Sequence, residues 1–125
     1  MSLAKNALGE QTFSKKYSFD KRLSEAERVL AKYPDRIPVI VERYTGQNTL
    51  PVMDKQKFLV PNDLTVGQFV YVIRKRIKLS SDKAIFIMID NKLPPTSYLL
   101  SQIYDTSKNK DKFLYMKYSS ENVFG

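Results

Sequence analysis

Between residues 18 and 33, apolar side chains recur every three or four positions, which predicts an amphipathic helix. Ser18 can cap its first turn, and the helix is expected to run to about Lys32. It should end at Tyr33, because a residue that precedes proline avoids helical backbone. The buried stripe is expected to comprise Phe19, Leu23, Ala26, Leu30 and Tyr33. The charged residues between them, among them Arg22, are expected to form a solvated face.

Two short strands and a second helix are expected next. The β-branched run at residues 37–43 predicts a strand, and residues 56–60 predict another that Pro61 halts. Thr65 and Gln68 then form a capping-box pattern, which marks the start of a helix. The apolar stripe of that helix is expected to be Val66, Phe69, Val70, Ile73 and Ile77.

The remaining pattern completes a recognisable order of elements. Residues 84–89 are apolar on both sides, which is typical of a central strand covered on both faces. A short helix is expected to start at residues 94–97, and a last strand at residues 113–118. The inward side of the short helix is expected to carry Leu99, Leu100, Ile103 and Tyr104. The order helix, β, β, α, β, α, β predicts an α+β domain with a β-grasp fold and a four-stranded mixed sheet.

Composition excludes several kinds of active site. The chain has 125 residues, enough for one domain, and contains neither cysteine nor histidine. Thiol nucleophiles, serine–histidine triads and cysteine/histidine zinc sites are therefore impossible. The four glycines are scattered, so no phosphate-binding loop is present. We expect no enzymatic activity, no catalytic residue, no metal site and no cofactor.

Charge and hydropathy limit the classes of partner that the protein is expected to bind. The net charge of +8 favours polyanions, anionic lipid head groups or acidic peptides. Aromatic residues lie mainly in the expected core stripes and not in a mixed basic and aromatic sheet motif, so nucleic-acid binding is the less favoured alternative. No apolar run approaches the roughly 20 residues of a membrane-spanning helix. The absence of cysteine fits a reducing compartment such as the cytoplasm.

The chain ends at Gly125, directly behind the last expected strand and a short polar tail. A terminal glycine has no Cβ, so its carboxylate can enter a narrow catalytic cleft. A chain that is joined to another molecule through its own C-terminus needs that freedom. For a terminal glycine taken alone, chance is the simpler explanation.

Several motifs in a fixed order are more specific. They are KYPDRIPVIVE (32–42), KFLVPNDLTVGQF (57–69), IRKRI (73–77), LPPTS (93–97), FLY (113–115) and FG (124–125). Together they closely resemble the ubiquitin-like modifiers of autophagy, in particular the branches of the GABA-receptor-associated protein and the microtubule-associated light chain. The resemblance runs from Ser18 to Gly125 and implies a ubiquitin-like β-grasp with additional N-terminal helices. It divides the chain into an extension that is mobile or partly helical (1–17), a helix packed on the core (18–35), the core (36–118) and a flexible tail (119–125).

The resemblance also implies a function. Members of the family are activated at the terminal glycine by an ATP-using enzyme and passed to a conjugating enzyme. They are then joined to phosphatidylethanolamine, which places them on autophagosome and vesicle membranes as well as in the cytoplasm. Many are first trimmed, and later released, by a cysteine protease. Gly125 is the implied conjugation site, and a peptide-binding adaptor that works without conjugation is the alternative.

Residues 57–60 are a candidate sheet edge, where an extended peptide can add as a further strand. Family members bind receptors and adaptors with an aromatic-x-x-aliphatic motif, whose two anchors would lie on opposite sides of that edge. The resemblance assigns the aromatic anchor to Glu25, Val29, Pro38, Lys57, Leu59 and Phe113. It assigns the aliphatic anchor to Phe58, Val60, Pro61, Leu64, Phe69, Val72 and Ile73. Acidic residues that flank the motif are expected to be attracted by Arg36, Lys55, Lys57 and Arg76.

Overall fold

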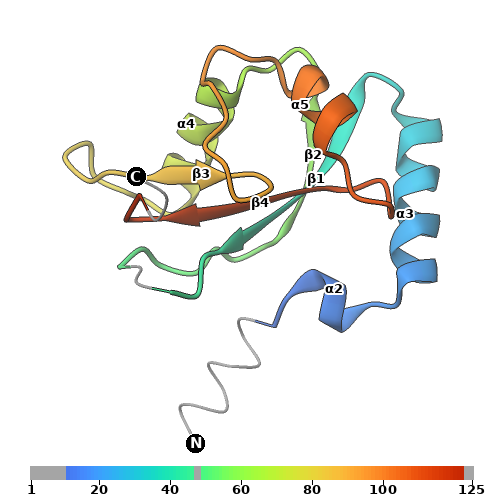
Figure 1. Cartoon of the computed structure of the whole chain (residues 1–125), viewed down its shortest axis with the longest axis horizontal. Coiled ribbons are helices and arrows are strands. Elements are labelled where there is room, and N and C mark those ends of the chain that lie inside the picture. The colour runs from blue at the N-terminus through green and yellow to red at the C-terminus, as the bar shows by residue number, and fades with distance from the viewer. Residues whose placement is uncertain (1–10, 47–48, 123–125) are drawn as a thin grey trace, which may run out of the picture.

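The computed structural model describes residues 11–46 and 49–122, and contains four helices and four strands in that part of the chain (Figure 1). The helices are α2 (Phe13–Lys16), α3 (Phe19–Lys32), α4 (Val66–Arg76) and α5 (Leu100–Ser107). The strands are β1 (Arg36–Arg43), β2 (Lys57–Pro61), β3 (Phe86–Met88) and β4 (Leu114–Ser119). Residues 1–10 of the expected extension and the expected conjugation site at Gly125 lie outside the described residues.

The four strands form one mixed sheet in the order β2-β1-β4-β3. The central strands β1 and β4 run parallel, while β2 and β3 pair antiparallel to them at the two edges. Helices α4 and α5 lie on one side of this sheet, with α2 on the other (Figure 1). The predicted α+β architecture, with a four-stranded mixed sheet, is confirmed.

The main core lies between the sheet and the two helices α4 and α5. Alternate residues of β1, Val39 and Val41, point into it, as do Leu114 and Met116 of β4. The predicted capping box fixes the start of α4. Thr65 Oγ1 accepts a hydrogen bond from the Gln68 N–H (3.1 Å), and Gln68 Oε1 accepts one from the Thr65 N–H (2.9 Å). The helical residues of this core include Val66, Phe69, Ile73, Leu100 and Ile103.

A second, smaller core lies on the opposite face of the sheet. It consists of Phe13 from α2, Ala26 from α3, Ile40 from β1 and Phe113, with Tyr115 packed against them. Phe13 is only 4% exposed, and its ring contacts that of Phe113 at 5.2 Å. Its N–H donates to the buried Glu42 carboxylate at 2.8 Å. The short helix α2 is therefore attached to the folded body.

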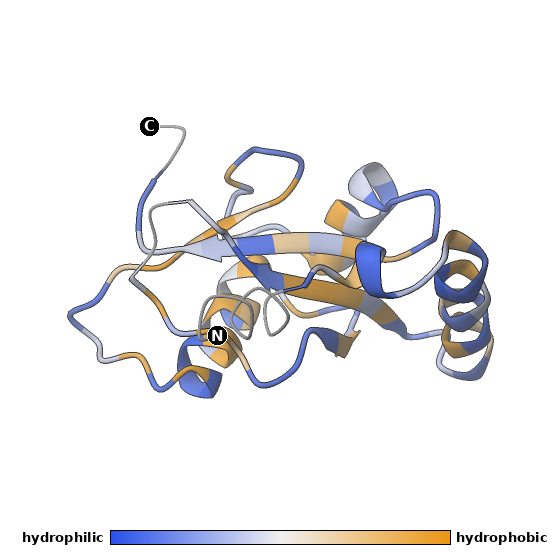
Figure 2. Ribbon diagram, turned by 90° about the horizontal axis from the view of Figure 1, so that it is seen from below, coloured by the Kyte–Doolittle hydropathy of each residue, from blue (hydrophilic) through white to orange (hydrophobic). Residues whose placement is uncertain are grey.

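The predicted stripe of α3 is only partly right. Ala26 is buried, but Phe19 and Tyr33, at the two ends of the helix, are 42% and 36% exposed. Figure 2, in which α3 lies at the right, shows hydrophobic and hydrophilic residues alternating along it. The helix meets the sheet around Ala26, so its ends extend past the covered area. The prediction that Arg22 faces solvent is also wrong, because Arg22 pairs with the buried Asp111.

The predictions for the third strand and the short helix need correction too. The third strand spans only Phe86–Met88 and lies at an edge, because β1 and β4 occupy the centre of the sheet. Helix α5 begins at Leu100, after the residues where a start was predicted. Leu99 precedes the helix as its N-cap and is 36% exposed, so it does not face inward.

Candidate functional site

Among the described residues, no strand pairs with the outer edge of β2, so main-chain groups lie along it. The Val41 N–H donates to the Gln56 carbonyl at 2.8 Å, so odd-numbered residues of β1 direct their main-chain groups toward β2. In an antiparallel pair, bonded and non-bonded positions alternate. The bonded positions of β2 are therefore Phe58 and Val60, which pair with Val39 and Ile37. The outward-facing positions are Lys57 and Leu59.

An open pocket of about 320 Å³ lies beside this edge, on the side of α3. Helix α3 contributes one wall, β1 and β2 contribute the other, and the almost fully buried Phe113 lies at its base. The structure brings together around it all six residues that were assigned to the aromatic anchor. The lining residues are Glu25, Arg28, Val29, Pro38, Lys55, Lys57, Phe58, Leu59 and Phe113.

Arg28 is the one lining residue that was not assigned to peptide binding, because it was expected only on the solvated face of its helix. It follows Glu25 by three positions and precedes Val29, so all three lie on one side of α3. That spacing is the signal in the sequence that could have identified it. Arg28 adds a cation to the α3 wall, opposite Lys55 and Lys57.

An ion pair spans the pocket. Lys57 Nζ pairs with the carboxylate of Glu25, and the two side chains are 51% and 25% exposed. Exposed pairs of this kind contribute at most about 1 kcal/mol to stability. Either partner can therefore exchange the other for a charged group of a bound peptide at little cost.

The residues assigned to the aliphatic anchor divide into two groups. Phe58, Val60, Phe69 and Ile73 are buried in the main core, where the rings of Phe58 and Phe69 meet edge to face at 5.8 Å. Leu64 is partly buried and packs against that core. Pro61 and Val72 are exposed, Val72 by 41%. The structure thus places Pro61 and Val72 at the surface, whereas the buried residues of this set form the core beneath that surface.

The cations assigned to acidic flanks surround β2. Lys55 Nζ lies 4.7 Å from the centre of the Phe58 ring, and the Arg36 guanidinium donates to the Leu59 carbonyl at 3.4 Å. Arg76 donates to both carboxylate oxygens of Asp54, at 3.0 and 3.3 Å. The hydrogen bond from Arg76 holds the pKa of Asp54 below its ordinary value. An acidic peptide would have to compete with Asp54 for Arg76.

Two further observations concern the described residues. They include no group of three or more acidic, histidine or cysteine side chains arranged to hold a metal ion. None of their helices is both long enough and apolar enough to span a membrane.

Comparison with known proteins agrees with this architecture. Residues 21–125 match the family model described as "Autophagy protein Atg8 ubiquitin like". Autophagy-related protein 8e of Arabidopsis thaliana is 63% identical over 107 residues, which cover 86% of this chain and 87% of that protein. Autophagy-related protein 8 of Mycosarcoma maydis is 59% identical over 113 residues, covering 90% and 95%.

Solved structures lead to the same family. The crystal structure of Trypanosoma brucei ATG8 superposes with a TM-score of 0.83 at 42% identity and covers 90% of this chain and 97% of that one. The resemblance predicted from the motifs is thereby confirmed. The chain belongs to the Atg8 family of ubiquitin-like autophagy proteins.

Proposed function

We propose that this protein is a ubiquitin-like modifier that is joined through Gly125 to phosphatidylethanolamine and binds aromatic-x-x-aliphatic peptides along β2. The pocket beside the outward edge of β2 is the observation that carries the peptide-binding part of the proposal. Membership of the Atg8 family supports the conjugation part.

The peptide adds to β2 as a further strand. Its main chain bonds to the outward groups of Lys57 and Leu59, which fixes its register. Its aromatic side chain enters the pocket above Phe113, and its aliphatic side chain lies on the other side of β2 near Leu64 and Val72. Burial of each anchor is worth about 1.5–3 kcal/mol, and ordering of the peptide opposes this gain. An affinity in the micromolar range is expected.

Titration of a fluorescent peptide Asp-Asp-Trp-Thr-Val-Leu tests this part. In the Leu59→Asp variant, a charge would lie against the aromatic anchor, so affinity should fall by more than about tenfold. Leu59 is partly exposed, and Leu93→Asp is the matched control, because Leu93 is an exposed leucine that follows β3 at the opposite edge of the sheet. Equal affinities for the two variants would refute the assignment of the peptide to β2.

In the conjugation reaction, the carboxylate of Gly125 is activated at the expense of ATP, carried as a thioester and transferred to the amine of phosphatidylethanolamine. The resulting amide links the chain to two acyl tails, enough for stable membrane anchoring. The catalytic thiols belong to the activating and conjugating enzymes and to the cysteine protease that trims or releases the modifier. This chain contains no cysteine and acts as their substrate.

A reconstituted reaction tests conjugation. Purified protein, family activating and conjugating enzymes, ATP and phosphatidylethanolamine liposomes should yield a lipid-linked product. Deletion of Gly125 should abolish it, whereas Glu121→Ala, which changes the same tail and leaves its end intact, should not. A product that persists without Gly125 would refute the attachment site, and peptide binding without any conjugation would favour the adaptor alternative.

A further inference from the structure

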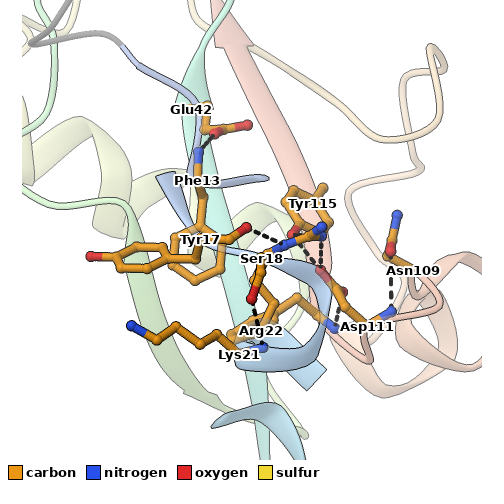
Figure 3. Close-up of polar contacts among 10 residues, drawn as sticks. Phe13, Tyr17, Ser18, Lys21, Arg22, Glu42, Asn109, Asp111 and Tyr115 are labelled. Carbon is orange, nitrogen blue, oxygen red and sulfur yellow. Dashed lines mark hydrogen bonds and ion pairs between the residues drawn. The ribbon is translucent and has the colours of Figure 1, made fainter. Parts of the chain in front are cut away.

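A buried carboxylate lies next to the base of the pocket between α3 and β2, which we call the aromatic pocket. Asp111, in the loop before β4, is fully buried. It accepts hydrogen bonds from Arg22 Nη1 (2.7 Å), the Tyr115 hydroxyl (2.5 Å) and the Phe113 N–H (2.9 Å). Figure 3 shows Arg22 of α3 and Tyr115 of β4 converging on it. We call Arg22, Asp111 and Tyr115 the carboxylate cluster.

Electrostatics favours keeping the three groups of the cluster together. Burial is the main cause that raises the pKa of Tyr115, and the hydrogen bond to Asp111 raises it further. The Tyr115 hydroxyl therefore stays protonated and remains a donor. The Arg22 side chain is 13% exposed and that of Asp111 is not exposed at all. An enclosed charge that loses its partner is strongly unfavourable, so each group holds the other in place.

The cluster connects the base of the pocket to its α3 wall. Asp111 bonds to the main chain of Phe113, whose ring lies at the base. Arg22 lies one turn before Glu25 and two turns before Val29, both of which line the α3 wall. A shift of α3 relative to Asp111 would therefore also change the distance between Val29 and Phe113.

The other polar links between α3 and the rest of the protein are weaker. The ion pairs Glu25–Lys57 and Glu27–Lys112 are in contact with solvent, and such pairs hold a helix loosely. Ala26 is small, so its packing limits rotation of the helix less than a large side chain would. Among the ion pairs of residues 11–46 and 49–122, Arg22–Asp111 is the most deeply enclosed.

We propose that Arg22, Asp111 and Tyr115 are positioning residues that set the width of the aromatic pocket and thereby its preference for an aromatic anchor. This inference rests on the proposed function, because it concerns the same pocket. None of the three lines the pocket, so they act through Phe113 and α3.

The test is a cycle of protein and peptide variants. Tyr115→Phe removes one hydroxyl from the cluster and preserves its shape, and Asp111→Asn removes its charge. Glu27→Gln is the matched control, since it breaks an ion pair between α3 and the loop before β4 but leaves the cluster intact. Each protein is titrated with Asp-Asp-Trp-Thr-Val-Leu and with the same peptide carrying Ala for Trp. Circular dichroism verifies folding, and Tyr115→Phe decides the outcome if Asp111→Asn does not fold.

Tyr115→Phe should weaken binding of the Trp peptide by about threefold or more, as substitutions within one hydrogen-bond network do, and leave the Ala peptide unaffected. The amide signals of Glu25 and Val29 in the peptide-free protein should also shift in Tyr115→Phe but not in Glu27→Gln. If the wild type prefers Trp and Tyr115→Phe keeps that preference, or loses both peptides equally, the positioning role is refuted and the proposed function stands. If the wild type does not distinguish Trp from Ala, the proposed function is refuted, and the positioning role with it.

Discussion

Replacement of Phe13 by alanine tests whether the segment before α3 belongs to the folded body. Phe13 is 4% exposed, contacts the rings of Phe113 (5.2 Å) and Tyr17 (5.0 Å), and bonds through its N–H to Glu42. The substitution removes the largest side chain that α2 contributes to the smaller core. It therefore measures how firmly α2 is attached.

The expected loss follows from burial. Burial of a phenylalanine side chain stabilises the folded state by about 1.5–3 kcal/mol. Truncation of a buried Phe to Ala lowers the free energy of unfolding by about 3–5 kcal/mol when a cavity remains. Helix α2 is a single turn near the chain end, so it can detach and leave no cavity. The cost should therefore be near the lower figure, about 3 kcal/mol.

Urea unfolding, followed by circular dichroism, gives this number. Tyr17→Ala is the control, because Tyr17 belongs to the same segment and contacts the Phe13 ring but is itself 44% exposed. It should cost less than about 1 kcal/mol, as surface substitutions do. Equal losses for the two variants would mean that Phe13 is not buried in solution and would refute the docking of α2.

Three further predictions concern single contacts. Thr65→Ala removes the side chain that caps α4 and should lower the free energy of unfolding by about 1 kcal/mol in urea titrations, whereas an unchanged value would contradict the capping box. Lys112 has a φ of 71°, a left-handed backbone conformation that is strained for any residue with a Cβ. Lys112→Gly and Lys112→Ala both lose the ion pair with Glu27, but only glycine relieves the backbone, so Lys112→Gly should be the more stable by about 1 kcal/mol in urea titrations. Equal stability of the two variants would contradict backbone strain at this position. Arg76 lowers the pKa of Asp54 in the folded protein. The pair therefore stabilises the fold at pH values above the ordinary pKa of Asp54, and this stabilisation is lost as the pH falls through the lowered pKa of the folded state. Asp54→Asn should therefore reduce the drop in melting temperature below about pH 4, and an unchanged acid profile would contradict the linkage.

Local signals in the sequence predicted much of this structure because their physical causes are local. Helix α3 is capped by Ser18, whose side chain accepts a hydrogen bond from the Lys21 N–H, and the capping box of α4 depends on residues three positions apart. The lysine in β2 indicated an edge strand, since a central strand would bury Lys57 without a partner. Periodicity and caps are thus readable without knowledge of the rest of the fold.

What the sequence did not reveal depends on contacts between distant residues. Asp111 and Arg22 are 89 positions apart, and nothing near either residue indicates that a carboxylate is buried there. Phe13 is one aromatic residue in a polar segment, so no periodic pattern marks it as buried. The short third strand is apolar like a central strand, but its place at the edge is decided by the pairing of β1 with β4.

Amide hydrogen exchange at β2 tests the peptide-binding edge most directly. The amides of Phe58 and Val60 face β1 and should exchange slowly with or without peptide, so they serve as internal references. Saturating Asp-Asp-Trp-Thr-Val-Leu should slow exchange at the outward amides of Lys57 and Leu59, because an added strand bonds to them. Exchange at these two amides that stays unchanged while the peptide is bound would contradict strand addition at β2.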